Sequence, residues 1–427
     1  MAFSLKFRKH LQARMIISSS MLLIAALVLC ANVIAISDET CSAEDMIKGN
    51  LQKLAIANNH MALNLYKKLS ADSTENLVFS PLSISLAFGM LFYGARGNSS
   101  KELSTVLGYK KAELKEALVH DTFNLLLNKL LRKESKEGYI LQTANSILAD
   151  RSLTLLPDFK REVAKLYKTF VFEEDFEKNA TEVVRKVNSW VTDNTYGKIN
   201  NLLNKLNPAA NIVILNAMYF KGGWLVRFPE KNTRQGLFYN NGLLSEAKNV
   251  PMMHVRTRFR YAEMDGYNVL ELPYRTRNIT MLLLLPNELD GLPALEQSLT
   301  LEELFDAQIS LFLTKVDVYL PRFKLEYSKE LSEEMQGLGA RSIFRSRSVD
   351  FSGMTPSKDV YVDEVIHKAM IEVNEMGSEA TAVTGVATFR MSYIRDDIPE
   401  FRADHPFMLL LMANSRMYFF MARVTAL

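Results

Sequence analysis

A stretch near the C-terminus limits the folds open to this chain: residues 371–393 read IEVNEMGSEATAVTGVATFRMSY. Its first four residues alternate between apolar and polar side chains, as in a β-strand. Residues 377–388 are mostly small or β-branched and include no proline, whereas an exposed loop usually carries Pro, Asn, Asp and several Gly. The stretch therefore has the composition of a strand that has not yet joined a sheet.

With a period of two residues, the two faces of this stretch differ. One face carries only uncharged and mostly small side chains, namely Ser378, Ala380, Ala382, Thr384, Val386 and Thr388. The single charged side chain between residues 378 and 388, Glu379, falls on the other face. One face is therefore suited to a tight interior and the other to solvent. An ordinary strand or a low-complexity linker would show the same pattern, so the pattern alone leaves these alternatives open.

The length of the chain would allow two or three domains, but no Pro/Gly/Ser-rich break, charge block or repeat divides its 427 residues. With a hydrophobic content of 48%, we expect one large domain over residues 45–427. The formal net charge of +3 includes four basic residues near the N-terminus, and removing them leaves −1. This balance gives no reason to expect a nucleic acid as partner.

The periodicity of apolar residues predicts the main elements of the chain. It predicts helices at residues 45–69, 101–135, 182–198 and 329–338. Continuous apolar runs predict buried strands at residues 212–220, 407–411 and 417–424. A further helix is expected to begin at Ser80 and Pro81, because a hydroxyl before the first turn and a proline within it are a common helix start.

Residues 1–35 have the layout of a secretion signal. The basic residues Lys6, Arg8, Lys9 and Arg14 precede an apolar run at residues 15–35, with small residues near its end. The alternative is a membrane anchor, since the run is nearly long enough to span a bilayer. A serine triplet inside the run and the absence of a basic cluster after it favour a cleaved signal. We therefore expect a secreted, extracellular protein that has no membrane partner.

Cysteine and sequon usage agree with this expectation. Of the two cysteines, Cys30 lies in the signal segment, so only Cys41 would remain and no internal disulfide is expected. Asparagines at three Asn-x-Ser/Thr sequons, Asn98, Asn179 and Asn278, are candidate glycosylation sites. Such triplets also occur by chance, so each is weak support alone.

Several motifs resemble those of the serpin superfamily. Residues 375–382, EMGSEATA, resemble the hinge of the serpin reactive-centre loop, and residues 404–407, DHPF, resemble the segment just beyond that loop. Residues 76–84 resemble the serpin pattern Asn-x-x-x-Ser-Pro-x-Ser-Ile, and residues 216–228 resemble Asn-Ala-x-Tyr-Phe-Lys-Gly-x-Trp-x-x-x-Phe. The resemblance covers about residues 51–424, and its motifs occur in the order found in the family.

The resemblance implies an α+β serpin fold with three β-sheets, about eight or nine helices, an exposed reactive-centre loop at about residues 375–400 and a metastable native state. It also implies suicide inhibition. A serine protease attacks the loop and forms an acyl-enzyme, and the cut loop then enters the central sheet as a new strand. Such a protein is not an enzyme, needs no cofactor or metal, and acts as a monomer in a covalent 1:1 complex with its protease.

The resemblance also assigns roles to individual residues. The hinge would consist of Glu375, Gly377, Ser378, Glu379, Ala380, Thr381 and Ala382. A group that we call the shutter, Ser80, Ser83, Asn216 and His367, would lie beneath the central sheet where its strands part. The usual spacing from the hinge places the reactive bond between Met391 and Ser392, a register one residue shorter places it after Arg390, and Arg395 is a third possibility. Methionine would suit chymotrypsin-like or elastase-like proteases, and arginine would suit trypsin-like proteases.

Other interpretations of these residues are weaker. Ser80 lacks the Gly-x-Ser-x-Gly setting of a nucleophile, so a helix cap is expected. His367 has no partner at metal-ligand spacing, so a buried, hydrogen-bonded histidine is favoured over a metal ligand or a catalytic base. A basic cluster, Lys129, Arg132, Lys133 and Lys136, stands where serpins often bind a glycosaminoglycan. The acidic residues among them favour a solvated helix end instead.

Two rival functions remain within the family. A non-inhibitory serpin acts as a carrier, a storage protein or a chaperone, and such members often have bulky, charged or proline residues in the hinge. The scaffold also permits inhibition of cysteine proteases. The small residues at positions 378–388 favour an inhibitor over a non-inhibitory serpin, and they leave inhibition of cysteine proteases open as the alternative to inhibition of serine proteases.

Overall fold

The computed structural model describes residues 43–71, 73–131, 139–358, 360–376, 398–413 and 416–427. The chain divides into two units, residues 1–49 and residues 50–427, and the fold described below is that of the second unit. All of the predicted signal segment, residues 1–35, and most of the predicted loop, residues 375–400, therefore lie outside the described residues. In the part of the chain that is described, no helix has the length and apolar character needed to cross a membrane.

The larger sheet has nine strands in the order β1-β14-β13-β8-β7-β6-β9-β12, with β5 paired to β6. The strands span Leu77–Phe79 (β1), Arg234–Tyr239 (β5), Ala247–Met264 (β6), Tyr267–Pro273 (β7), Ile279–Pro286 (β8), Phe312–Pro321 (β9), Glu400–Arg402 (β12), Phe407–Ala413 (β13) and Tyr418–Val424 (β14). The 18-residue strand β6 pairs with β5 at residues 247–252, with β9 at residues 252–261 and with β7 at residues 260–264. The described residues therefore form two hydrogen-bonded sheets where three were predicted, because β6 joins β5, β9 and β7 into one sheet.

The smaller sheet has five strands in the order β10-β11-β4-β2-β3. They span Tyr139–Asp150 (β2), Val171–Glu174 (β3), Ile212–Gly222 (β4), Phe323–Glu330 (β10) and Val362–Val373 (β11). The two central strands β4 and β11 run parallel, whereas their outer neighbours β2 and β10 are antiparallel to them. Residues 212–220 are buried throughout, as predicted for a central strand.

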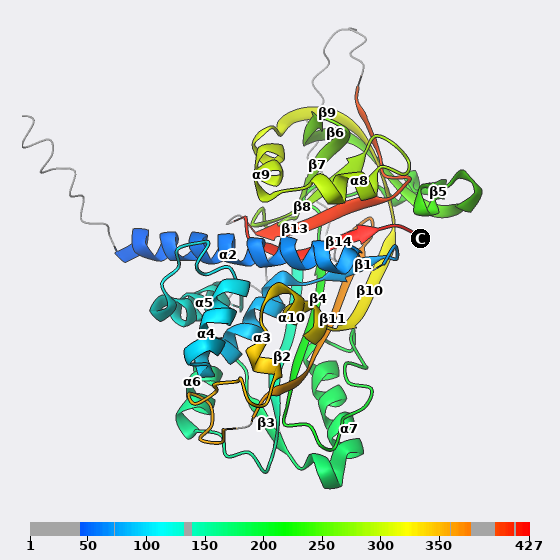
Figure 1. Cartoon of the computed structure of the whole chain (residues 1–427). Helices are drawn as coiled ribbons and strands as arrows, with labels where there is room; N and C mark the ends of the chain where they lie inside the picture. Colours follow the sequence, from blue (N-terminus) through cyan, green and yellow to red (C-terminus); the bar gives the residue numbers. More distant parts are fainter. Residues whose placement is uncertain (1–42, 72, 132–138, 359, 377–397, 414–415) are drawn as a thin grey trace, which may run out of the picture. The chain divides into compact units, whose positions relative to one another are not determined.

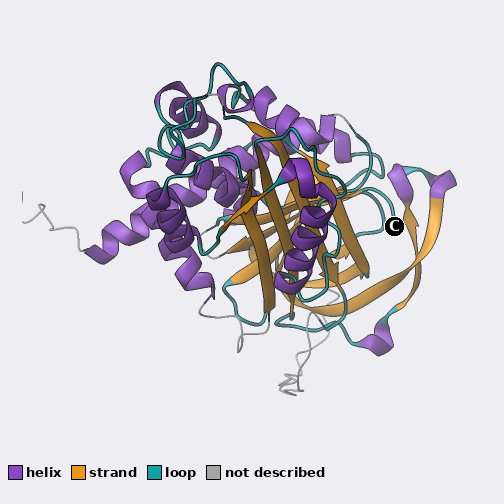
Figure 2. Ribbon diagram, turned by 90° about the horizontal axis from the view of Figure 1, so that it is seen from below, coloured by secondary structure: helices purple, strands orange, loops and turns teal. Residues whose placement is uncertain are grey.

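Nine α-helices occur in the described residues, in agreement with the expected eight or nine. They span Ala43–Ala71 (α2), Pro81–Gly94 (α3), Gly97–Val106 (α4), Glu116–Leu131 (α5), Pro157–Tyr167 (α6), Phe176–Asn194 (α7), Leu292–Ser298 (α8), Leu301–Ile309 (α9) and Ser332–Leu338 (α10). Helix α3 contacts β2 and β4 of the smaller sheet and β14 of the larger sheet, so it lies between the two sheets. Figure 2 shows the strands in the interior with helices packed against them.

Helix α7 covers the other face of the smaller sheet. Three of its residues one turn apart, Val183, Val187 and Val191, are buried in one cluster with residues of β2 and β4. The segment that follows, residues 198–206, packs over β4 and β11 through Ile199, Leu202 and Leu203. The amide of Asn188 fixes this segment, since its Oδ1 accepts the backbone N–H groups of Leu202 and Leu203 at 2.9 and 3.0 Å. Any strand that entered between β4 and β11 would therefore lie beneath this segment.

Three predicted helix boundaries were wrong. Residues 101–135 form two helices, α4 and α5, because the chain turns at Gly108, where φ is +78° and a Cβ would lie 2.5 Å from the carbonyl oxygen of Ala57. Helix α7 starts six residues earlier than predicted, at Phe176 after the cap Asp175, and ends at Asn194, before Gly197 at φ +73°. The start of α10 shifts to residue 332, because residues 329 and 330 pair with β11 as part of strand β10.

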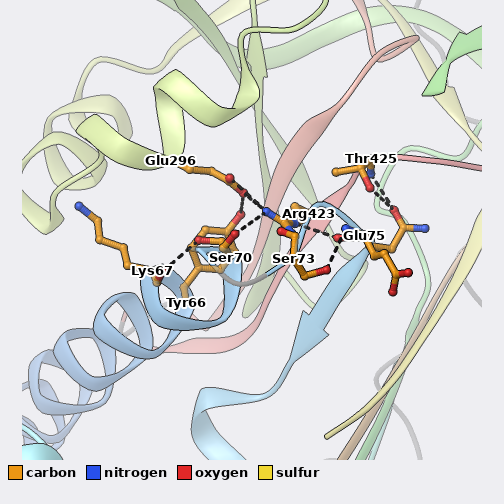
Figure 3. A network of polar contacts seen from close by, with 9 residues as sticks. Tyr66, Lys67, Ser70, Ser73, Glu75, Glu296, Arg423 and Thr425 are labelled. Atoms are coloured by element: carbon orange, nitrogen blue, oxygen red, sulfur yellow. Dashed lines mark hydrogen bonds and ion pairs between the residues drawn. The ribbon is translucent and has the colours of Figure 1, made fainter. Parts of the chain in front are cut away.

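A buried ion pair fixes the last strand of the chain (Figure 3). The guanidinium of Arg423 on β14 lies 3.2 Å from the carboxylate of Glu296 on α8, and the Tyr66 hydroxyl of α2 donates to the same carboxylate at 2.5 Å. Arg423 also donates to the backbone carbonyl groups of Ser70, Ser73 and Glu75. A single arginine thereby ties β14 to two helices and to the connection before β1. Such a buried charge is stabilising only while its partners remain in place.

Candidate functional site

Strand β11 runs directly into the segment predicted as the hinge, and the start of that segment is held by several contacts. The indole N–H of Trp224 donates to the carbonyl oxygen of Asn374 at 2.7 Å. The Glu375 carboxylate accepts the hydroxyl of Thr233 at 2.9 Å and lies 3.6 Å from the guanidinium of Arg322. The backbone N–H of Phe228 donates to the carbonyl oxygen of Glu375 at 3.1 Å. The chain is thus fixed at the point where it leaves the sheet.

Only part of the predicted loop can be placed. Of the hinge residues, Glu375 is described, whereas Gly377, Ser378, Glu379, Ala380, Thr381 and Ala382 lie outside the described residues. The candidates for the reactive bond, Arg390, Met391, Ser392 and Arg395, also lie outside them. Their assignments remain predictions from the sequence.

A row of three polar side chains crosses the middle of the smaller sheet. Asn145 of β2 lies opposite Asn216 of β4, and Asn216 lies opposite His367 of β11. The Nδ2 of Asn216 donates to the Oδ1 of Asn145 at 2.6 Å, and the Oδ1 of Asn216 is bonded to the Nδ1 of His367. Since Asn216 and His367 are fully buried, these bonds satisfy groups that water cannot reach.

Helix α3 supplies the rest of the shutter from below this row. The hydroxyl of Ser83 donates to the Oδ1 of Asn216 at 2.9 Å, and the backbone N–H of Ser80 donates to the Nε2 of His367 at 3.2 Å. The Ser80 hydroxyl oxygen accepts the backbone N–H of Ser83 at 3.1 Å, as expected of a helix cap. All four predicted shutter residues are therefore in one buried network, together with Asn145.

The hydrogen bonds define the state of the buried histidine. Since Nε2 of His367 accepts a backbone N–H, the ring proton is on Nδ1 and is donated to the Oδ1 of Asn216. Burial lowers the pKa of the His367 imidazole to about 3, because the charged form is deprived of its solvation by water. The imidazole is thus neutral and structural at ordinary pH.

This network does not form a catalytic site. The Nε2 of His367 is occupied by the backbone of Ser80, so it is not free to take a proton from the Ser80 hydroxyl. That hydroxyl instead contacts the Sδ of Met218 at 2.7 Å. Within the described residues, no group of three or more His, Cys, Asp or Glu side chains could hold a metal ion. What the arrangement can do is hold β4 and β11 together over α3.

Some residues of this region were missed in the sequence. Asn145 completes the polar row, and its only signal is a polar side chain in a strand that is otherwise largely buried. Lys368 of β11 donates to the carbonyl oxygen of Asn201 at 2.9 Å, and the ammonium of Lys198 lies 3.4 Å from the carboxylate of Glu372 on β11. Both contacts hold the segment after α7 against β11. Neither contact has a local sequence signal, because the partners are more than 160 residues apart.

The remaining predicted sites are scattered. Asn98 is exposed on α4 and donates to Glu102 at 2.7 Å, Asn179 is exposed where α7 is kinked, and Asn278 is partly exposed in the turn between β7 and β8. Lys129 lies in the last turn of α5. The other members of its cluster, Arg132, Lys133 and Lys136, lie outside the described residues. Glycosylation and glycosaminoglycan binding remain predictions.

Comparison with known proteins agrees with this architecture. Residues 56–427 match the family model described as Serpin (serine protease inhibitor). The chain is 34% identical to Iripin-8 of Ixodes ricinus over 90% of its own length and 96% of that protein. It is 35% identical to the leukocyte elastase inhibitor of Homo sapiens over 86% of its length and 97% of that protein.

The fold is also similar to solved structures. The structure of human thyroxine-binding globulin matches with a TM-score of 0.79 and 28% identity, over 88% of this chain and 99% of that one. The predicted α+β serpin fold is thereby confirmed. With the family model, the relatives and the fold in agreement, the chain belongs to the serpin family.

Proposed function

We propose that this protein is a secreted suicide inhibitor of serine endopeptidases, which traps its protease as an acyl-enzyme while the cut loop inserts between β4 and β11. The observation that carries the proposal is the parallel pairing of β11 with β4, combined with the position of the loop directly after β11. A chain that turns back after Val373 runs antiparallel to β11. Because β4 is parallel to β11, the same chain would be antiparallel to β4 as well.

Insertion would improve the pairing of the sheet. It would replace one parallel ladder, from Val362–Ile212 to Ile371–Phe220, by two antiparallel ladders, which are slightly more stable per residue. Each additional hydrogen bond contributes about 1 kcal/mol net. The small side chains at alternate positions of residues 378–388 would fit the face over the shutter. Separation of β4 from β11 would require the hydrogen bond between Asn216 and His367 to break.

The part of the chain after the cut would stay in place. Strands β13 and β14 each have a strand neighbour on both sides in the larger sheet, and Arg423 ties β14 to Glu296. Cleavage near Met391 would therefore free the segment attached to β11 without releasing the C-terminal strands. The inhibitor would move its loop while the rest of its core remained intact.

The partner would be a serine protease with trypsin-like, chymotrypsin-like or elastase-like specificity. The name of the human relative, leukocyte elastase inhibitor, supports this class. Secretion is supported by the basic and apolar layout of residues 1–35, and glycosylation by the exposure of Asn98 and Asn179. We further propose that the protein turns over no substrate and needs no cofactor.

The test is incubation of the chain without residues 1–35 with trypsin, chymotrypsin and pancreatic elastase in turn. We expect an SDS-stable complex at the summed mass of inhibitor and protease for at least one enzyme, and sequencing of the released ends would locate the cut at Arg390, Met391 or Arg395. Complete cleavage by every enzyme without any complex would contradict the proposal. That outcome would favour a carrier function, in line with the name of thyroxine-binding globulin. A complex with papain alone would identify a cysteine-protease inhibitor.

A further inference from the structure

One face of the larger sheet carries an unexplained pair of like charges. On β6, Arg256, Arg258 and Arg260 occupy alternate positions and are all exposed. Lys315 of β9 is also exposed, and it lies directly opposite Arg258 in the antiparallel register. Like charges at directly opposite positions of neighbouring strands are destabilising. The fold therefore gains nothing from this arrangement on its own.

The other cations of this face are neutralised. Both the Nε and the NH2 group of Arg256 donate to the carboxylate of Asp317, the Nε at 2.9 Å. The guanidinium of Arg260 lies 3.7 Å from the carboxylate of Glu271. The guanidinium of Arg402 on β12 lies 2.6 Å from the carboxylate of Glu400.

Arg258 and Lys315 differ from their neighbours. Among the described residues, neither side chain takes part in a hydrogen bond or an ion pair. Two adjacent cations that have no counter-charge in the part of the chain that the structure describes are suited to bind an anionic group from outside the fold. We call Arg258 and Lys315 the cationic pair.

An exposed apolar side chain adjoins the cationic pair. Leu313 lies two residues before Lys315 on the same face of β9, directly opposite Arg260, and is 66% exposed. Arginine is enriched at protein–protein interfaces, and a large exposed apolar side chain beside arginines is suited to such a contact. The face is therefore suited to a protein surface that carries acidic residues.

The short distance along the chain between the predicted reactive bond and this face indicates which protein could contact it. Strand β12 starts at Glu400, nine residues after Met391, and nine residues span at most about 30 Å. Strand β12 pairs with β9, and β9 pairs with β6, and Figure 1 shows β6 and β9 side by side. A protease of ordinary size is about 45 Å across. A protease bound at the reactive bond is therefore wide enough to extend over these strands.

We propose that the cationic pair, with Leu313 beside it, is a secondary docking surface for the target protease, which carries acidic residues next to its active-site cleft. This inference rests on the proposed function. Its role is to raise the rate of the first encounter, because charges at the rim of an interface act mainly on association and on its salt dependence. Loop insertion follows that step and would not depend on the pair.

The test compares anionic and cationic trypsin, which share their preference for arginine and lysine but carry opposite net charges. The double variant Arg258→Glu/Lys315→Glu keeps two like charges at the same positions and reverses their sign. At low salt, we expect it to associate about tenfold more slowly with anionic trypsin and faster with cationic trypsin. In 1 M NaCl, where the Debye length is about 3 Å, both differences should disappear. The yield of SDS-stable complex per cut chain should not change.

A matched control has the same change of net charge elsewhere. Lys101 and Lys110 are exposed in and after α4, apart from the β6–β9 face (Figure 1), and Lys101→Glu/Lys110→Glu should change neither rate by more than about twofold. Two results would overturn the docking surface while leaving the proposed function intact. In the first, complexes form but the cationic-pair variant associates with both trypsins at the wild-type rates. In the second, the control variant shifts the association rates as strongly as the cationic-pair variant. If the wild type forms no SDS-stable complex with trypsin, chymotrypsin or elastase, the proposed function is overturned and the inference with it.

Discussion

Asn216 and His367 lie directly opposite each other on the parallel strands β4 and β11, and the amide oxygen of Asn216 accepts the Nδ1–H of the imidazole. The other ring nitrogen accepts the backbone N–H of Ser80 at the start of α3. One neutral histidine thus connects both central strands to the helix beneath them. Because the proposed insertion would pass between β4 and β11, the strength of this connection would set part of the barrier to insertion.

The first prediction concerns acid. Burial lowers the pKa of His367 to about 3, against about 6.5 in an unfolded chain. Below pH 6.5 the unfolded state binds a proton that the folded state excludes, so the free energy of unfolding falls as the pH falls from 6.5 towards 3. Between pH 7 and pH 5 we expect a loss of about 2 kcal/mol from this group, measured as a shift of the urea midpoint.

A second histidine provides the comparison for this experiment. Burial lowers the pKa of His120 to about 4, so this side chain contributes in the same direction and over nearly the same pH range. The variant His367→Gln should keep the part due to His120 and lose the part due to His367. An equal pH dependence in wild type and variant would show that the pKa of His367 is the same in the folded and unfolded states, and would contradict this prediction.

The sequence was sufficient to predict the elements that depend on local pattern. The apolar run at residues 212–220 gives a central strand because both faces of that strand are covered, by α3 on one side and by the segment after α7 on the other. Ser80 caps α3 as expected. The break between α4 and α5 was missed, because the reason for it is the close approach of Gly108 to the backbone of α2, a long-range contact.

The site was predictable only in part. Ser80, Ser83, Asn216 and His367 were identified through the resemblance, and the structure brings them together. Without the resemblance, the sequence would not have shown that these four residues contact one another, because nothing near a buried serine or asparagine in the sequence indicates its hydrogen-bond partner. The pairing of Arg258 with Lys315 was invisible for a similar reason, since it depends on the register between two strands about 50 residues apart.

The second prediction concerns the ion pair behind the C-terminal strand. Glu296→Leu should lower the free energy of unfolding by about 3 kcal/mol, because it leaves the charge of Arg423 buried without its partner. The double variant Glu296→Leu/Arg423→Leu should recover part of this loss, since it removes the charge as well. Recovery would be incomplete, because three backbone carbonyl groups lose their donor. Denaturant midpoints would measure both effects, and a double variant weaker than Glu296→Leu would contradict this account.

The third prediction concerns the hinge. Ser378→Arg would bring a charge into the sheet, and Ala380→Pro would remove a ladder donor. Both changes should slow insertion more than hydrolysis, so the protein would become a substrate and at least about nine tenths of the SDS-stable complex should be lost. Glu379→Gln is the matched control, because residue 379 falls on the opposite face, and it should keep the wild-type yield. Undiminished complex from both Ser378→Arg and Ala380→Pro would contradict the small-residue requirement.

The last prediction tests whether the intact fold is held short of its most stable form. A single cut near Arg390 or Met391 should raise the melting temperature by about 10 °C or more, because about ten new hydrogen bonds and the burial of small side chains accompany insertion. The same cut in Ala380→Pro should leave the melting temperature nearly unchanged, since its free end cannot complete the ladder. The rise measured by calorimetry should also coincide with protection of residues 378–388 from a second protease. If the cut wild type melts at its original temperature and that segment stays accessible, no more stable state exists for the cut chain to reach, and the parallel seam between β4 and β11 is simply part of a rigid scaffold.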